Sequence, residues 1–269
     1  MHLGLSSYTY PWAVGVPGYW PDQPLTPLDL LERTREAGLR YLQIGDNLPL
    51  HTQTAAVLEA LHGEARAAGV GIQVGTRRLE VVHLRRYLAL AERFGSPFLR
   101  VVIDDADYHP DVATVVPIIQ AVLPDFRAAG VVLAIENHDR FPARTLARII
   151  EQTDPEWVGI CLDTANSIGA GEGADTVVEV LAPYTVNLHL KDVRIERLPH
   201  KMGFTVSGCA AGEGLIPIPE LIRHLDTTGR CATATLEIWS NPEPTALDCI
   251  QKEAILADRS INYLRSLFT

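Results

Sequence analysis

The chain has 269 residues, 47% of them hydrophobic, and a formal net charge of −10. A chain of this length buries about 75% of its unfolded surface, so it needs neither disulfides nor a metal ion in order to fold. The acidic balance argues against nucleic acid as a partner, because a phosphate backbone requires a basic face. No uninterrupted apolar run reaches about 18 residues, so we expect no membrane span.

The N-terminal residues and the cysteines both indicate a cytoplasmic protein. The opening MHLGLSSYTYPW has no basic region followed by an apolar stretch, which predicts no signal peptide. The cysteines are Cys161, Cys209, Cys231 and Cys249, and no two of them form a CxxC pair. We therefore expect reduced thiols.

Short apolar runs typical of buried strands alternate with longer amphipathic stretches typical of helices. The strand-like runs are 3–7, 40–46, 70–76, 98–104, 131–137, 158–163, 185–192 and 233–239. The helical stretches are 27–38, 52–68, 81–95, 111–129, 143–153, 174–182, 217–229 and 246–267. This alternation predicts an α/β protein with one (β/α)8 TIM barrel domain over residues 1–269. A doubly wound sheet is the alternative, but the chain has neither GxGxxG nor a P-loop.

Two connections are long, residues 8–26 and 193–216. Both follow strands, so a barrel places them at its C-terminal face, where active sites lie. Long loops in a compact domain are often lids or substrate contacts. We expect the same of these two, with a plain cover of the barrel mouth as the alternative.

Four ionisable residues stand at or near the ends of four successive strand-like runs: Glu136, Asp163, His189 and Glu237. A buried ionisable side chain is costly unless it is paired or bound to a metal. In a barrel these strand ends lie side by side, so the set predicts one divalent metal site. The oxygen-rich donors favour Mn²⁺, with Mg²⁺, Co²⁺ or Zn²⁺ as alternatives. A cluster of carboxylates that share protons is the other interpretation.

Two of these residues are also candidates for proton transfer. Glu136 and Glu237 come from different strands and are expected to approach a substrate from opposite sides. Such a pair can remove a proton from one face of a carbon and return one to the other. The metal would polarise a carbonyl or hydroxyl oxygen and stabilise an enediolate.

Several strings resemble the sugar phosphate isomerase/epimerase family of xylose-isomerase-like barrels. They are AIENHDR (134–140), CLDTANS (161–167), LHLKDV (188–193), GCAAGEGLIPIPEL (208–221) and LEIWS (236–240). The similarity covers most of the chain and is strongest from 131 to 240. It implies that Glu136, Asp163, His189 and Glu237 bind one divalent metal. It also implies that the two glutamates serve as acid and base, as in ketose epimerases.

One position departs from the family pattern. Many members have a histidine three residues after the strand 6 aspartate, where this chain has Asn166. An amide can contact substrate through hydrogen bonds but cannot take up a proton at neutral pH. A reaction or substrate other than that of the simple ketose epimerases is therefore open. The extra metal ligands of the related apurinic endonucleases are missing from 192–210 and from Gln73 and Val74, which argues against DNA repair.

Further substrate contacts are expected on the strands. Lys191 follows His189 by two residues and is expected to contact a substrate oxygen, or else to pair with a neighbouring carboxylate. Arg100 lies inside a strand and needs either a site carboxylate or the substrate as its partner. His138 is expected to orient a ligand carboxylate or touch substrate, with a rim hydrogen bond as the alternative. Gln43 ends the second strand and is expected to hold substrate hydroxyls.

The two long connections supply the remaining candidates. Arg197, His200 and Lys201 are expected to bind a carboxylate or phosphate on the substrate, or to form a solvated basic face. Trp12 is expected to wall a sugar with its ring face, or to anchor its loop.

The sequence therefore predicts a metal-dependent isomerase or epimerase of a small sugar or sugar derivative. A lyase with the same metal site is the first alternative, either a decarboxylase of a 3-oxo sugar acid or an eliminase of a 3-keto-glycoside. A non-catalytic sugar-binding barrel is the second. A carbohydrate is the expected partner, and a homo-oligomer is compatible with the chain.

Overall fold

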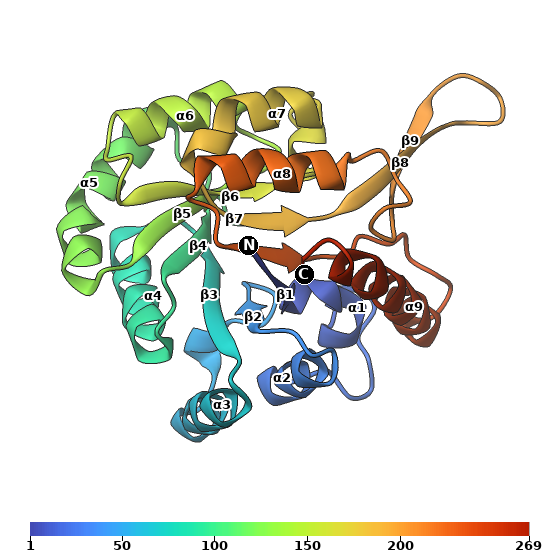
Figure 1. Ribbon diagram of the computed structural model, residues 1–269, viewed down its shortest axis with the longest axis horizontal. Helices are drawn as coiled ribbons and strands as arrows, with labels where there is room; N and C mark the ends of the chain where they lie inside the picture. The colour runs from blue at the N-terminus through green and yellow to red at the C-terminus, as the bar shows by residue number, and fades with distance from the viewer. Residues whose placement is uncertain (269) are drawn as a thin grey trace.

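The computed structural model describes residues 1–268 and shows a closed barrel of parallel strands with helices around it (Figure 1). The strands are β1 (His2–Ser6), β2 (Tyr41–Ile44), β3 (Gly71–Arg77), β4 (Phe98–Val102), β5 (Val132–Glu136), β6 (Val158–Asp163), β7 (Thr185–Leu190) and β10 (Thr233–Leu236). They follow one another in chain order, and β10 closes the barrel against β1. The predicted TIM barrel is confirmed.

The main helices are α2 (Pro27–Glu36), α3 (Ala55–Ala68), α4 (Val81–Phe94), α5 (Val112–Ala129), α6 (Ala143–Glu151), α7 (Ala174–Leu181), α8 (Ile218–Thr228) and α9 (Ala246–Arg265). Short 3-10 turns cover Ser7–Thr9, Leu50–Thr52, Asn166–Ile168 and Ala182–Tyr184. Local sequence sets several helix ends. Thr26 caps α2 through the backbone N–H of Asp29, and Gly69 and Gly95 end α3 and α4 in the left-handed conformation.

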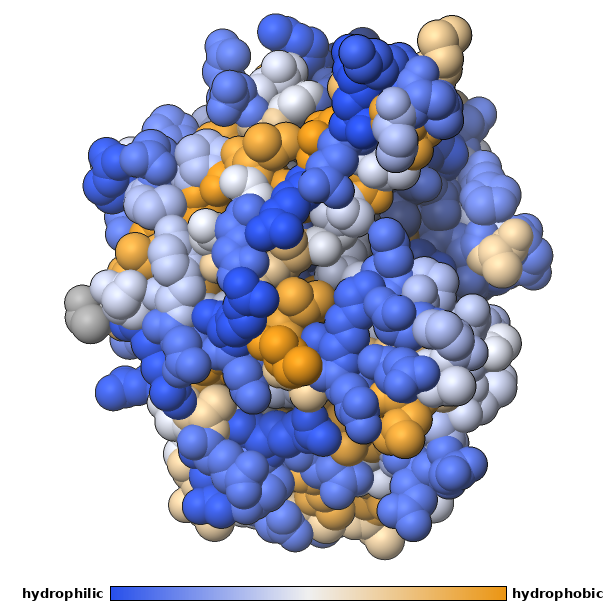
Figure 2. Space-filling view, turned by 90° about the vertical axis from the view of Figure 1, so that its right-hand side faces the viewer, coloured by the Kyte–Doolittle hydropathy of each residue, from blue (hydrophilic) through white to orange (hydrophobic). Residues whose placement is uncertain are grey.

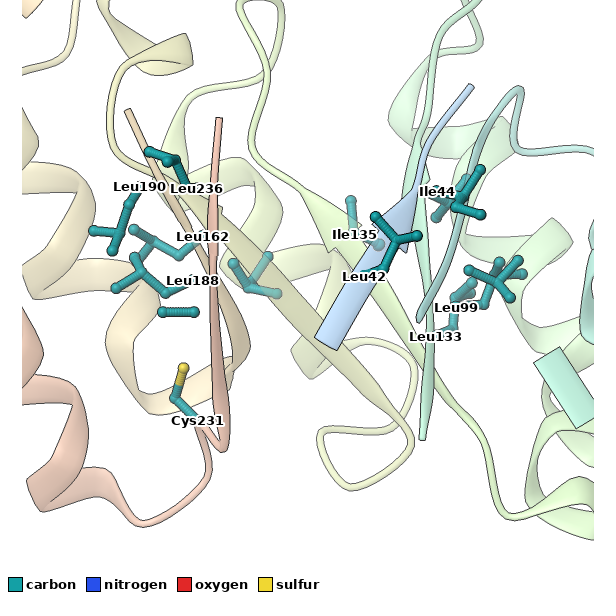
Figure 3. Packing of buried hydrophobic residues seen from close by; sticks show 14 of the residues in the cluster. Leu42, Ile44, Leu99, Leu133, Ile135, Leu162, Leu188, Leu190, Cys231 and Leu236 are labelled. Atoms are coloured by element: carbon teal, nitrogen blue, oxygen red, sulfur yellow. The ribbon is translucent and has the colours of Figure 1, made fainter. Parts of the chain in front are cut away.

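Alternate residues of each strand point to opposite faces, so the outer and inner faces of the barrel carry different side chains. Leucines and isoleucines such as Leu133, Ile135 and Leu188 face outward into a core shared with the helices (Figure 3). The inward positions are largely polar. Gln43, Asn187, Thr233 and their neighbours form hydrogen bonds across the barrel. The metal-ligand candidates occupy the same inward face nearer the C-terminal rim: His189 is two residues beyond Asn187, and Glu237 is four beyond Thr233.

Helix α5 is the one described helix long and apolar enough to cross a membrane by length and composition alone. It was not expected, because polar residues such as Gln120 and Asp125 interrupt its apolar stretch. In the structure it packs between α4 and α6 and over β5, with Val115, Ile119 and Phe126 buried. This is the packing of a core-facing barrel helix.

Residues 192–209 form a hairpin that the sequence analysis treated as part of a loop. Strands β8 (Asp192–Arg197) and β9 (Phe204–Cys209) pair antiparallel and project from the barrel as an arm (Figure 1). Ile195 pairs with Val206 on one face, and Arg197 stacks on the Phe204 ring on that same face. Figure 2 looks at the side of the molecule from which this arm projects and shows orange hydrophobic residues exposed among blue hydrophilic ones.

The connection 8–26 is anchored rather than free. It contains the short helix α1 (Pro11–Val14), whose first backbone N–H groups have no partner within the helix. The buried carboxylate of Glu253 on α9 accepts the N–H groups of Trp12 and Ala13, each at 2.7 Å. The C-terminal helix therefore holds the loop that follows the first strand.

Candidate metal centre

The four predicted ligands meet at the C-terminal rim of the barrel. Glu136 ends β5, Asp163 ends β6, His189 lies in β7, and Glu237 follows β10. All four are at most 2% exposed. The register places Asp163 directly beside His189, so neighbouring strands bring residues far apart in sequence into contact.

His189 is the centre of the cluster. Its Nε2 lies 2.6 Å from Oε1 of Gln43, whose amide nitrogen donates to Asn187. Nε2 therefore carries the proton, and the lone pair of Nδ1 faces the carboxylates. Nδ1 lies 3.2 Å from Glu237 and 3.4 Å from Glu136. Among residues 1–268 no hydrogen bond reaches it.

The donor atoms fit a divalent cation. Nδ1 of His189 is buried and has no hydrogen-bond partner within the described chain, and the buried oxygens Oδ2 of Asp163 and Oε2 of Glu237 face only the ammonium of Lys191, at 2.8 and 2.9 Å. Potential donor atoms of these three residues lie within 4.8 Å of one another. Buried polar atoms are normally satisfied, so the unpartnered Nδ1 of His189 beside these carboxylates indicates a place for a cation. Carboxylates with one neutral imidazole suit a hard or borderline metal.

Glu136 completes the set but is held differently. Its Oε2 accepts a hydrogen bond from Nε of Arg100, and its Oε1 accepts one from Asn166 at 2.8 Å. Cys161 also has its sulfur near this residue and His189. That thiol donates to Asn187 at 3.2 Å, and burial raises its pKa well above the usual range. A thiol that keeps its proton is a poor ligand, so the expectation of an oxygen-rich site stands.

Two buried cations balance the carboxylates. Nζ of Lys191 lies 2.8 Å from Asp163 and 2.9 Å from Glu237. Burial by itself would raise the pKa of Glu237, but the positive charges of Lys191 and Arg100 act in the opposite direction and the pKa is lowered. Burial would likewise lower the pKa of Lys191, but Asp163 and Glu237 raise it well above its usual range. Lys191 is therefore a firmly held ammonium.

A cavity of about 240 Å³ opens above these residues. Its lining is Tyr8, Arg77, Arg100, Glu136, His138, Asp139, Asn166, Gly169, Lys191, Glu237 and Trp239. Four of the predicted substrate contacts, Lys191, Arg100, His138 and Asn166, are thus at the cavity. For Lys191 and Arg100 the structure also shows the alternative that the sequence left open, an ion pair with site carboxylates.

The other predicted contacts lie elsewhere. Gln43 is 1% exposed and holds His189 from below, so it does not line the cavity. Trp12 is buried and donates to Ser240 at 2.7 Å, which is the loop-anchoring role. Arg197 and His200 lie exposed on the arm, where β7 continues outward, and they are not part of the cavity wall. Their predicted contact with a carboxylate or phosphate of the substrate stays a prediction, and their exposed position is also that of the alternative, a solvated basic face.

Other cavity residues were missed by the sequence analysis. Arg77 ends β3, and Trp239 stands two residues after Glu237, with Lys191 5.1 Å from the centre of its ring. A further missed residue, Ser6 of β1, is fully buried outside the cavity lining and donates to Glu237 at 3.0 Å. Their common signal is a position at the C-terminal end of a strand, which in a barrel faces the active-site rim.

A model of the family described as xylose isomerase-like TIM barrel matches residues 31–267. The chain belongs to this family. It is 31% identical over 266 residues to a 3-oxo-isoapionate decarboxylase of Pectobacterium atrosepticum, across 98% of this chain and 95% of that protein. The family resemblance stated from the sequence is confirmed.

Solved structures show the same fold. A D-psicose 3-epimerase of Clostridium cellulolyticum H10 superposes with a TM-score of 0.73 and 17% identity, over 99% of this chain and 98% of that one. A xylose isomerase-like barrel of Mycobacterium smegmatis, solved with magnesium, superposes with a TM-score of 0.66 and 16% identity, over 89% and 88%. At these identities the likeness supports the fold alone.

Proposed function

We propose that this chain is a sugar-modifying enzyme, and that it acts as a divalent-metal-dependent decarboxylase of a 3-oxo sugar acid. One observation carries the choice. Each glutamate that would have to take a proton from carbon contacts a buried cation: Glu136 contacts Arg100, and Glu237 contacts Lys191. The likeness to a decarboxylase of a 3-oxo acid over nearly the whole chain supports the same choice.

An epimerase needs a carboxylate that readily accepts a proton. A guanidinium or ammonium in contact lowers the proton affinity of a carboxylate, and the pKa of Glu237 is lowered in this way. Asn166, which touches Glu136, cannot relay a proton either. A decarboxylase avoids this requirement, because it breaks a carbon–carbon bond and needs only an electron sink and a proton donor.

Each residue of the site has a proposed role in the decarboxylation. A divalent ion bound by Glu136, Asp163, His189 and Glu237, which we propose to be Mn²⁺, would polarise the ketone of the substrate. The carbon–carbon bond to the carboxylate breaks and CO₂ leaves. The electron pair of that bond stays on the carbon next to the ketone. Nζ of Lys191, buried among Asp163, Glu237 and Trp239, is the proposed proton donor: a divalent ion that took up the charge of both carboxylates would free this ammonium to give that carbon a proton. Arg100 holds Glu136 in place.

The test is turnover of freshly prepared 3-oxo sugar acids by metal-loaded protein in D₂O. We expect CO₂ release and one deuterium in the product, with Mn²⁺ the most active metal. Lys191→Met should slow release by about 10²–10⁴-fold, the usual contribution of a general acid, and should still bind metal by elemental analysis. The epimerase alternative, favoured by two glutamates on different strands, predicts deuterium in recovered sugar and no CO₂. That outcome would overturn the proposal.

A further inference from the structure

Arg77 is the residue at the cavity whose charge the metal centre does not use. It ends β3 and lines the cavity with about a third of its side chain exposed. Its buried Nε faces Oδ2 of Asp46, and no other nitrogen of its guanidinium has an acceptor in the described chain. These remaining donors are therefore available to a ligand in the cavity.

The carboxylate nearest to Arg77 is already engaged. Oδ2 of Asp46 lies 3.2 Å from Nε of Arg77. The same carboxylate accepts hydrogen bonds from Arg100 and from the hydroxyl of Tyr8. One carboxylate therefore faces two guanidinium groups, and Arg77 keeps both its charge and its unused donors. The neighbouring Arg78, by contrast, donates to Glu80 and Asp107.

The order of the strands in the barrel places Arg77 on the opposite side of the barrel mouth from Lys191, the proposed proton donor. β3 is four strands away from β7 in a closed ring of eight, so the two stand on opposite sides. A ligand seated on Lys191 beside β7 would extend over Glu136 toward Arg77. A second hollow of about 430 Å³ meets the metal cavity at Arg77, His138 and Asp139, which gives that end room for a bulky group.

We propose that Arg77 binds an anionic group, a carboxylate or a phosphate, on the end of the substrate remote from the metal ligands. The planar guanidinium, with its unused donors, suits two-point binding of either group. This inference rests on the proposed function and narrows its substrates to sugar acids with a second anionic group. It also gives Arg77 the kind of role that the sequence analysis predicted for Arg197 and His200.

The experiment measures ligand affinity by calorimetry on the Mn²⁺-loaded protein. Three four-carbon ligands are compared: threonate with one carboxylate, tartrate with a second carboxylate, and 4-phosphoerythronate with a phosphate. We expect at least one doubly charged ligand to bind about tenfold or more tightly than threonate. The tighter of the two identifies the preferred anion.

Arg77→Met should abolish this preference while leaving threonate binding unchanged, and Arg77→Lys should retain part of it. Arg78→Met is the matched control and should keep the full preference. Equal binding of all three ligands by the unmodified protein would overturn the inference, as would an equal loss for all three in Arg77→Met. Failure of the proposed function is separate, because it appears as absent CO₂ release whatever the ligand preference.

Discussion

At the scale of single residues, the metal ligands depend on a polar layer beneath them. Gln43 fixes the proton of His189 on Nε2, and Asn187 and Gln73 in turn fix the orientation of Gln43. Partners of this kind set the tautomer of a ligating histidine and raise its affinity for metal. The barrel interior is therefore part of the metal centre, although none of these amides would touch the ion.

Replacement of Gln43 should test this support directly. In Gln43→Met the ring of His189 loses the acceptor that holds its Nε2 proton. We expect metal affinity to fall about 10- to 100-fold, as is usual for residues that orient a ligand, with the barrel still folded. Competition with a coloured chelator measures it. Gln23→Met, on an exposed loop position, is the control; equal affinities in both variants would contradict the role.

The buried Glu253 predicts a pH dependence of stability. Burial raises its pKa from 4.5 to about 7, even though two backbone N–H groups act in the opposite direction. Between these values the unfolded chain releases the proton and the folded chain keeps it. Stability from this group is therefore complete below about pH 4.5 and is lost as pH rises to about 7, by up to about 3 kcal/mol.

Urea unfolding from pH 4.5 to 8, with Glu253→Gln beside the unmodified protein, isolates this contribution. The other titrating groups are common to both proteins, so the difference between the two curves belongs to Glu253. We expect the glutamine variant to gain relative stability as pH rises. Parallel curves would show that the carboxyl titrates normally.

The ligand residues were predictable because each breaks an apolar run at a strand end. Gln43 and Arg77 were harder to assign for a different reason. A glutamine at a strand end reads equally well as a substrate contact or as a support for a ligand, and only the height of the side chain in the barrel decides. Arg77 is followed by Arg78 in the sequence, and the contrast between a paired and an unpaired arginine exists only in three dimensions.

At the scale of elements, the barrel strands and their helices lie close to their predicted ranges, and the arm is the main exception. In strand β8, Val193 and Ile195 alternate with charged residues, but Arg197 ends the alternation, so the strand has too few apolar residues to predict burial. Exposed Ile195, Phe204 and Val206 show that the hairpin has no apolar face against its own barrel. A strand is recognised in a sequence by the apolar residues that it buries, and this hairpin buries few.

The arm should be the first place where a protease cuts. Its turn carries the exposed Arg197 and Lys201, and its outer strands have few contacts with the barrel. Brief trypsin treatment of the folded protein should give two fragments, with cleavage after Arg197 or Lys201 identified by mass. The two halves should stay associated and retain the metal. A first cut within 8–26 or within the helix ring would contradict this assignment.

The base of the arm rests on one carboxylate and two glycines. Asp192 accepts the backbone N–H groups of Gly212, Gly214 and Ile216. A Cβ on Gly214 would stand 2.1 Å from Oδ1 of Asp192 and 2.4 Å from a backbone oxygen. The segment after the arm can therefore only close around a glycine at this position.

Gly214→Ala should destabilise the protein by about 2 kcal/mol or more, since either the buried carboxylate or the backbone must shift. Gly63→Ala is the matched change. Gly63 lies inside α3 with open space around it, so alanine should stabilise by about 0.5–1 kcal/mol. Chemical denaturation of both variants gives the comparison. A loss at both positions, or at neither, would refute the steric argument.

At the scale of the whole molecule, the metal centre joins strands from most of one half of the barrel to its first strand. Ligands come from β5, β6, β7 and the end of β10, and Ser6 of β1 donates to Glu237. An ion bound there ties these elements together in the folded state only. Binding of this kind raises stability by mass action.

Removal of the metal should therefore lower the melting temperature. Free metal at about 100 times its dissociation constant adds about 2.7 kcal/mol, which corresponds to about 5–10 °C for a chain of this size. Thermal scans before and after chelation, and after Mn²⁺ is added back, measure the shift. Asp163→Ala should melt at the same temperature in all three conditions. An equal shift in that variant would place the effect outside the predicted centre.

The hydrogen bond between Ser6 and Glu237 also has a consequence for biosynthesis. Ser6 and Glu237 lie 231 positions apart in the sequence, so the centre has no complete set of ligands until the segment that forms β10 has been made. Domains generally fold from the N-terminus as they emerge, but this one must wait for β10 to close against β1. The ligand set is therefore complete only after β10 has closed the barrel, and until then the apolar strands of an open barrel must be kept from aggregating.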